Sequence, residues 1–243
     1  MGEYERFALI IDSEVPALGS VAVRLLDLGI DLLYAANLDE ATLLAAQESQ
    51  RLGAVLIPSS FEADLVEDLI SRVCSKLAAG PRALIIVGLE RESDFVECLR
   101  NHGVEWAVCE PYTDRDLRFV MTAAMSTGHT GERRKHPRIP TNIETTVFMG
   151  RHRKRVVVHD LSVTGAYFAT PHPFLEEARI SLDLPLPNGR VLGNGFVVNA
   201  KTADKPGRPD VPEGMGVSFS NLSQESYERL QDFIEGWIDC FRL

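Results

Sequence analysis

Short apolar runs alternate with helix-like patterns along the first half of the chain. The runs cover residues 7–11, 32–35, 54–57, 83–87 and 106–109. Between them apolar residues recur at helical spacing, and the pattern predicts helices from Leu18 to Leu28, from Asp39 to Leu52, and onward from a cap at Thr113 or Asp114. Strands that lack polar alternation and are separated by helices indicate a parallel sheet covered on both faces. We therefore predict an α/β domain of five strand–helix units, doubly wound and flavodoxin-like.

The second half of the chain changes to short β-rich runs. They cover residues 144–148, 156–159, 166–168, 180–184, 196–198 and 216–219, with Pro, Gly and Asn between them. Six short strands at this spacing predict a small antiparallel barrel or sandwich. The period then becomes helical, with an apolar stripe from Tyr227 to Phe241 after a cap at Ser223. Such a C-terminal helix must bury its stripe on the barrel or on another subunit.

Charge divides the chain at the same place. Residues 1–126 hold 10 Lys and Arg against 21 Asp and Glu, a net charge of −11, whereas residues 127–243 hold 15 against 14, a net charge of +1. The stretch Ser126-Thr-Gly-His-Thr-Gly131 is small, polar and rich in glycine, as linkers are. We place the domains at 1–126 and 133–243, with a linker at 127–132.

Composition indicates the compartment in which the protein is expected. The chain has 243 residues, 45% of them hydrophobic, and no apolar run approaches the ~18 residues of a membrane-spanning helix. Its four cysteines form no Cys-x-x-Cys pair, which favours reduced thiols over disulfides or a metal site. We expect a cytoplasmic protein without membrane insertion.

The first domain resembles a response-regulator receiver over residues 6–125, through Asp12 at the first strand end and Pro111 after the fifth strand. The sequence departs from the receiver pattern at the positions that carry out phosphorylation in receivers. The third strand ends in Pro58-Ser59-Ser60 without a carboxylate, and Glu110 stands where receivers carry a lysine. Without the acidic nucleophile no acyl phosphate forms. We interpret the domain as a pseudo-receiver that docks a protein partner or forms a homodimer; modification of Ser59 or Ser60 stays open.

A basic segment, Glu132-Arg133-Arg134-Lys135-His136-Pro137-Arg138, opens the second domain. Pro137 pushes the residue before it out of the helical region, so the segment is expected to be extended. Arg134 and Arg138 would then face the same side, roughly 13 Å apart. Arginine forks match phosphate and the guanine edge bidentately. The alternative for this segment is a solvated linker.

A second motif, Asp160-Leu-Ser-Val-Thr-Gly165, follows a strand. Asp160 and Ser162 would share one side of that strand, where a carboxylate can accept from guanine N–H groups and a hydroxyl can donate to phosphate. Gly165 permits a positive φ or a close ligand approach. The alternative is a plain Asx or Ser turn between two strands.

Together the two motifs resemble a PilZ domain over residues 131–241, including Gly214-Met-Gly-Val-Ser-Phe219 and the terminal helix. PilZ domains are receptors for the bacterial second messenger cyclic di-GMP. The resemblance implies that Arg133, Arg134 and Arg138 wrap the phosphates and guanine edges of this ligand. It further implies that the motif of Asp160, Ser162 and Gly165 holds a guanine on the barrel surface.

The resulting hypothesis is a non-enzymatic cyclic di-GMP effector without any further cofactor. Closure of the Arg133–Arg138 arm would reorient the pseudo-receiver domain and change the binding of an unidentified protein. The alternative is a ligand-independent scaffold protein of a motility or polarity complex. A nucleic-acid binder using Arg133–Arg138 and the predicted hairpin turn Arg151–Arg155 is disfavoured by a domain charge of only +1. We find no catalytic constellation and no metal-ligand cluster in the sequence.

Overall fold

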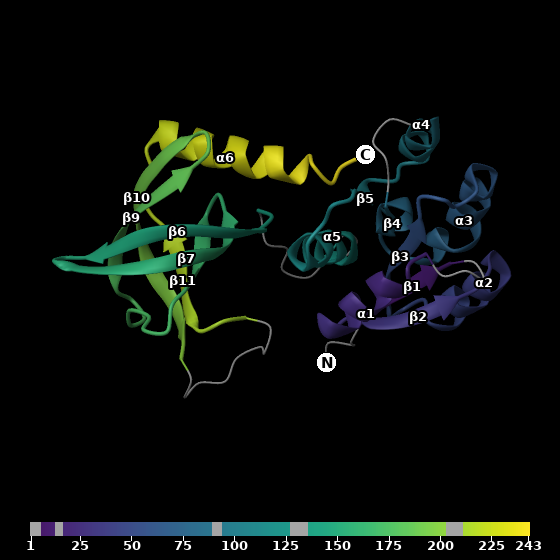
Figure 1. Ribbon diagram of the computed structural model, residues 1–243, viewed down its shortest axis with the longest axis horizontal. Coiled ribbons are helices and arrows are strands. Elements are labelled where there is room, and N and C mark those ends of the chain that lie inside the picture. Colours follow the sequence, from purple (N-terminus) through teal and green to yellow (C-terminus); the bar gives the residue numbers. More distant parts are fainter. Residues whose placement is uncertain (1–5, 13–16, 89–93, 127–135, 203–210) are drawn as a thin grey trace. The chain divides into compact units, whose positions relative to one another are not determined.

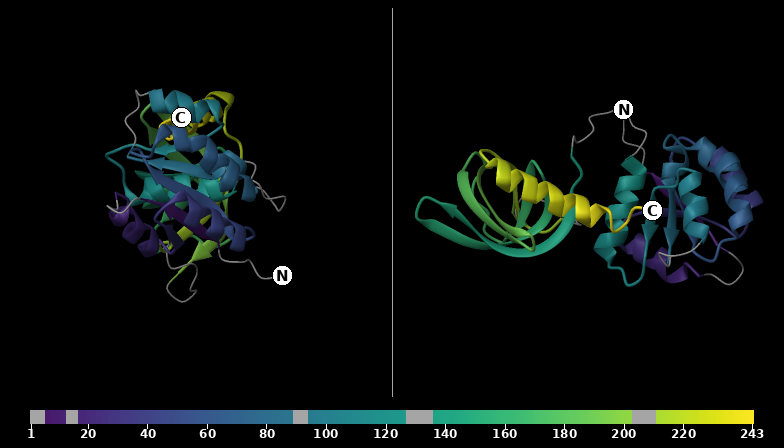
Figure 2. Two further views of the ribbon diagram at one scale, coloured as in Figure 1. Left: turned by 90° about the vertical axis from the view of Figure 1, so that its right-hand side faces the viewer. Right: turned by 90° about the horizontal axis from the view of Figure 1, so that it is seen from above.

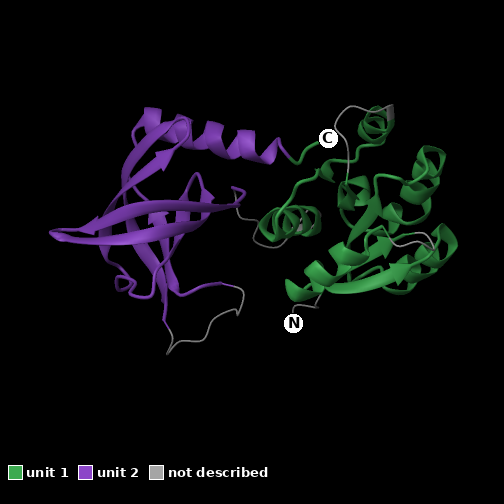
Figure 3. Ribbon diagram, viewed as in Figure 1, with its two compact units in different colours: residues 1–133, 241–243 green, residues 134–240 purple. Residues whose placement is uncertain are grey.

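The computed structural model describes residues 6–12, 17–88, 94–126, 136–202 and 211–243. The chain forms two compact units (Figure 3): unit 1 comprises residues 1–133 with 241–243, and unit 2 comprises residues 134–240. The chain therefore enters unit 2 after residue 133, and its last three residues belong again to unit 1.

Unit 1 is a parallel sheet with helices between its strands (Figure 1). The strands are β1 (Phe7–Ile11), β2 (Asp31–Ala35), β3 (Leu52–Pro58), β4 (Leu84–Val87) and β5 (Trp106–Val108). The helices are α1 (Gly19–Asp27), α2 (Leu38–Gln47), α3 (Val66–Arg72), α4 (Asp94–Asn101) and α5 (Asp114–Ser126), with short 3-10 turns at Ala63–Leu65, Cys74–Lys76 and Gly80–Ala83. The strand order β2-β1-β3-β4-β5 confirms the predicted flavodoxin-like arrangement.

Both faces of this sheet are covered. Leu9 and Ile11 of β1 join one core with α2, α3 and α4, whereas Ala8 and Ile10, equally buried, lie outside that cluster. On the other face, α5 packs against β3, β4 and β5 and also contacts α1 (Figure 2). Every residue of β3 is buried. This two-sided burial is why the strands read as unbroken apolar runs.

Several element boundaries in unit 1 differ from the predictions, and two of them change the kind of structure that the residues form. The helix expected to reach Leu52 ends at Gln47, because residues 48–51 form a turn in which Leu52 N–H donates to Glu48 O at 2.8 Å. Leu52 then opens β3. Ala83 lies in a 3-10 turn before β4 instead of within the strand. Apolar spacing alone does not distinguish a buried strand start from one more helical turn.

Unit 2 is a closed antiparallel barrel. Its strands are β6 (Ile139–Met149), β7 (His152–Ser162), β8 (Gly165–Ala169), β9 (Arg179–Leu186), β10 (Gly189–Lys201) and β11 (Gly214–Phe219). They close in the order β10-β11-β8-β7-β6-β9, which confirms the barrel and not the sandwich. Buried and more exposed positions alternate along β9, from Arg179 outside to Ile180 inside, as a half-buried strand requires.

The terminal helix α6 (Gln224–Ile238) packs against β10, β7 and β6. Its predicted cap is confirmed, because the Ser223 hydroxyl accepts from Ser226 N–H at 3.1 Å. The predicted extension of its apolar stripe to Phe241 is wrong. The helix ends at Ile238, and Phe241 belongs to unit 1, where its ring centroid lies 5.9 Å from that of Phe119. No helix in the described part of the chain is both long and apolar enough to span a bilayer.

Candidate functional site

The Asp160–Gly165 motif is the hairpin that joins β7 to β8. Ser162 pairs with Gly165 across a two-residue turn, and the Ser162 hydroxyl donates to the Gly165 carbonyl at 3.0 Å. Ser162 is only 2% exposed. The serine therefore rigidifies the turn, as the structural alternative for this motif supposes.

Gly165 is required by the packing of two backbones. A Cβ at this position would overlap the carbonyl oxygen of Val217 on β11, and the residue has no positive φ. The close approach that the sequence indicated is thus made by a neighbouring strand. A similar constraint holds at Gly214, whose Cβ would overlap the carbonyl oxygen of Phe168.

A β-bulge precedes the motif and sets the direction of its side chains. Val158 pairs with Phe168 and Asp160 with Tyr167, so His159 is an extra residue opposite β8; the pairing with β6 shifts at the same level. Val158 and Leu161 are fully buried, whereas the side chains of His159 and Asp160 are 22% and 32% exposed. A bulge places consecutive side chains on one face of a strand. His159 and Asp160 therefore both lie on the outside of the barrel.

His159, Asp160 and Tyr167 form a polar cluster on this outer surface. The His159 Nδ1 lies 2.9 Å from the Asp160 Oδ2, and the His159 ring meets the Tyr167 ring edge-on with centroids 6.1 Å apart. The Tyr167 hydroxyl donates to the Pro212 carbonyl at 2.7 Å. Burial, and then the charges of Asp160 and Glu213, raise the pKa of Tyr167. Tyr167 is thus a neutral hydrogen-bond donor that lies opposite Asp160 on the neighbouring strand.

Sequence reasoning missed His159 and Tyr167 as members of this cluster. The only signal for His159 in the sequence is its position next to Asp160. Its involvement depends on the bulge, because regular alternation would have put the two side chains on opposite faces.

The arginine motif ends at Arg138, directly before β6, the strand that pairs with the Asp160 region of β7. Arg138 is exposed and directly precedes Ile139, which pairs with Leu161. The next residue, Pro140, pairs with Asp160. The fold therefore brings the end of the arginine motif to the edge of the Asp160–Gly165 hairpin, although more than twenty residues separate them. Arg133 and Arg134 lie outside the described residues.

The second basic cluster lies at the opposite end of β7. Gly150 and Arg151 form the turn between β6 and β7, and residues 152–155 begin β7. A hairpin at this place is confirmed, but the predicted turn over Arg151–Arg155 is wrong beyond Arg151, because the following residues pair with β6. Lys154 donates to the His172 carbonyl at 2.5 Å and covers the Phe174 ring. This lysine thus has a packing role, whereas Arg151, Arg153 and Arg155 are exposed.

The residues that follow strands β1, β3 and β4 of unit 1 lie at the carboxyl ends of the parallel sheet. Asp12 is buried, and its carboxylate accepts from Leu18 N–H at 2.7 Å, a role in closing the β1–α1 loop. The residues after β3 are Ser59 and Ser60, and Gly88 follows β4 with a φ of 81°. Ser13 and Glu14 lie outside the described residues. Among the described residues we find no group of three or more His, Cys, Asp and Glu placed to hold a metal ion.

The family model of the PilZ domain matches residues 132–236. A search of curated proteins gives no match.

Several solved structures are similar to about half of this chain. The motility inhibitor MotI (DgrA) of Bacillus subtilis is 16% identical, with 44% of this chain and 52% of that chain covered and a TM-score of 0.37. The PilZ domain of Escherichia coli YcgR, solved with c-di-GMP, is 16% identical, with 43% and 91% covered and a TM-score of 0.33. Vibrio cholerae CheY4, a chemotaxis protein, is 16% identical, with 48% and 96% covered and a TM-score of 0.40. The match with MotI spans about half of that protein's length.

Proposed function

We propose that this chain, which carries a PilZ domain at residues 132–236, is a non-enzymatic effector that binds cyclic di-GMP. The observation that carries the proposal is the pairing of β6 with β7, which sets Arg138 at the edge of the hairpin holding Asp160, Ser162 and Gly165. Arg138, which can pair with phosphate, thereby directly precedes the stretch of β6 that pairs with Asp160, which can accept from guanine.

In this proposal each group has a stated role. Arg133, Arg134 and Arg138 contact the phosphates and guanine edges. Asp160 accepts from a guanine through a carboxylate that is one-third exposed. Ser162 and Gly165 hold the hairpin in shape, since their hydrogen bond and close packing are already made within the barrel.

Ligand binding would act by closing the Arg133–Arg138 arm on the barrel. Fixing a residue in one conformation costs about 1–2 kcal/mol, and charge-assisted contacts of about 1.5–3 kcal/mol each would have to exceed that cost. Because the arm continues from the linker, we propose that its closure reorients unit 1 and changes the binding of a protein partner. Small-angle scattering with and without cyclic di-GMP tests this step, and identical curves would contradict it.

Calorimetric titration of cyclic di-GMP into the whole chain tests the binding itself. We expect micromolar or tighter binding that is lost in Arg134→Ala and weakened at least tenfold in Asp160→Asn. The matched control is Arg151→Ala, an exposed arginine at the other end of β7, which should bind like the unaltered chain. Absence of heat with the unaltered chain would contradict the proposal.

The second candidate is a ligand-independent scaffold of a motility or polarity complex. One observation favours it: the roles of Ser162 and Gly165 are accounted for by the turn and by β11. The exposed carboxylate of Asp160 has no such structural explanation beyond its bond with His159. The calorimetric result therefore separates the two candidates.

A further inference from the structure

The edge of β5 in unit 1 pairs with the last residues of the chain through one antiparallel bridge. β5 is the last strand of the sheet, and residues 241–243, which we call the tail segment, pair with its outer side. Ala107 N–H donates to the Phe241 carbonyl at 2.9 Å, and Leu243 N–H donates to the Glu105 carbonyl at 3.1 Å. Trp106 and Arg242 form the antiparallel bridge between these two bonds. The contact is strand addition, in which main-chain bonds bind an extended peptide.

Each side chain of the tail segment also meets a matching surface. Phe241 is 9% exposed, and its ring lies beside Phe119, which in turn meets Trp106 edge-on at 6.0 Å. Leu243 packs against the core that α2, α3 and α4 cover. The side chain at one end of the tail segment is thereby buried and the one at the other end is partly buried, which removes apolar surface from water.

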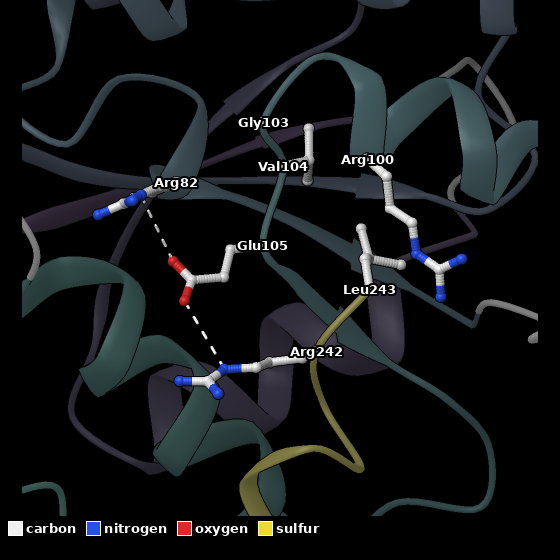
Figure 4. Close-up of a pocket in the computed structure, with 7 residues that line it drawn as sticks. All are labelled: Arg82, Arg100, Gly103, Val104, Glu105, Arg242 and Leu243. Carbon is white, nitrogen blue, oxygen red and sulfur yellow. Dashed lines mark ion pairs between the residues drawn. The ribbon is translucent and has the colours of Figure 1, made fainter.

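The central residue of the tail segment faces a carboxylate. Arg242 Nε lies 3.7 Å from Glu105 Oε1, and Arg82 Nε lies 3.7 Å from the other oxygen of the same carboxylate (Figure 4). These residues, with Arg100 and Leu243, line a cavity of about 280 Å³ at this edge of the unit. A basic residue therefore fits at the middle position of the bound strand.

We propose that the edge of β5 is a peptide-binding site for an aromatic–basic–aliphatic strand, and that its ligand is the tail segment of the same chain. An uncovered edge strand offers unpaired N–H and C=O groups to other chains, and covering it prevents that pairing. The tail segment is a specific ligand because it satisfies the main chain, both apolar contacts and the carboxylate together. A partner protein using this edge must displace it. The proposal is independent of cyclic di-GMP binding.

Peptide binding in trans tests the site. The chain is shortened to residues 1–240, and a fluorescent peptide of residues 236–243 is titrated against it by anisotropy. We expect saturable binding to the shortened chain and at least tenfold weaker binding to the full chain, whose own tail segment covers the edge. Peptides with Phe241→Ala or Arg242→Glu are the matched controls and should bind at least tenfold more weakly. No saturable binding to the shortened chain, or equal binding to both chains, would overturn the proposal.

A charge exchange in the full chain gives a test that needs no truncation. In Arg242→Glu the tail segment should detach, and hydrogen exchange at the Ala107 amide should accelerate at least tenfold. Adding Glu105→Arg to that variant should restore the slow exchange. Equal exchange in all three proteins would overturn the proposal. A dimer of the full chain that the truncation converts to a monomer would overturn the assignment of the ligand to the same chain, because the tail segment would then bind a second copy.

Discussion

Gly165 on β8 and Val217 on β11 lie so close that the Val217 carbonyl oxygen occupies the space where a Cβ on residue 165 would stand. Both residues lie in strands that pair with each other, so neither strand can move aside without breaking this ladder. The glycine that ends the Asp160–Gly165 motif is therefore required for the packing of β8 against β11, whatever the motif binds.

The substitution Gly165→Ala should destabilise the barrel by about 1–3 kcal/mol or more, because it overpacks a rigid site. Gly236→Ala is the matched control. Gly236 lies in α6, and a Cβ added there would meet no neighbouring side chain within 4 Å, so alanine should stabilise by about 0.5–1 kcal/mol. Denaturant unfolding followed by Trp237 fluorescence, in a Trp106→Phe background, measures both changes. Unchanged stability in Gly165→Ala would contradict the packing argument.

The pKa of Tyr167 should respond to the charge of Asp160. Burial is the largest cause of its raised pKa, and Asp160 is the next. In Asp160→Asn the pKa should fall but remain above the ordinary value, since burial and Glu213 still act. Phenolate absorbance against pH, with Tyr167→Phe subtracted to isolate this residue, measures the shift. A pKa that does not change would place Asp160 farther from the ring than the structure does.

The same raised pKa predicts a pH dependence of stability. The folded state holds the Tyr167 proton more tightly than the unfolded state, whose tyrosine has a pKa near the ordinary value of 10.0. The contribution is therefore complete below that pH and is lost as the pH rises through the folded pKa. Unfolding free energies measured on either side of pH 10 should fall less steeply in Tyr167→Phe than in the unaltered chain. Equal slopes would contradict the sign.

Much of the fold follows from patterns in the sequence, because the relevant physics is local. The strands of unit 1 are unbroken apolar runs since both faces are buried, and β3 illustrates this along its whole length. The barrel strands were predicted too short, because their ends carry polar residues. In β7, for example, residues 152–155 are mostly exposed and charged yet pair with β6.

The candidate site was only partly predictable from the sequence, because a strand irregularity and a long-range contact determine the rest of it. Asp160 and Ser162 could be identified from their spacing, but the role of His159 depends on a bulge that interrupts the period of two. The tail segment depends on a contact between residues more than 130 positions apart, Trp106 and Arg242. Helical spacing placed Phe241 on α6, since nothing in the local sequence signals where the helix gives way to strand pairing.

The barrel core should depend far more on Phe168 than on the exposed Phe196. Phe168 is among the largest fully buried side chains, whereas Phe196 is 37% exposed and lies beside the Arg179 guanidinium. Phe168→Ala should cost about 3–5 kcal/mol through lost burial and the cavity left behind. Phe196→Ala should cost less than about 1 kcal/mol. Thermal unfolding of the two variants compares them directly, and similar losses would contradict the assignment of the core.

Cysteine reactivity should separate the buried from the exposed thiols. Burial raises the pKa of Cys74 to about 12, and the side chain is fully covered, whereas Cys240 is exposed after the end of α6. At pH 8 only about one Cys74 thiol in ten thousand would be ionised, and the thiolate is the form that reacts. Alkylation of the native protein, followed by peptide mass spectrometry, should therefore modify Cys240 early and Cys74 only under denaturing conditions. Cys240→Ser is the control that removes the fast reaction. Rapid native labelling of Cys74 would show that the core between the sheet and α3 opens far more readily than its packing implies.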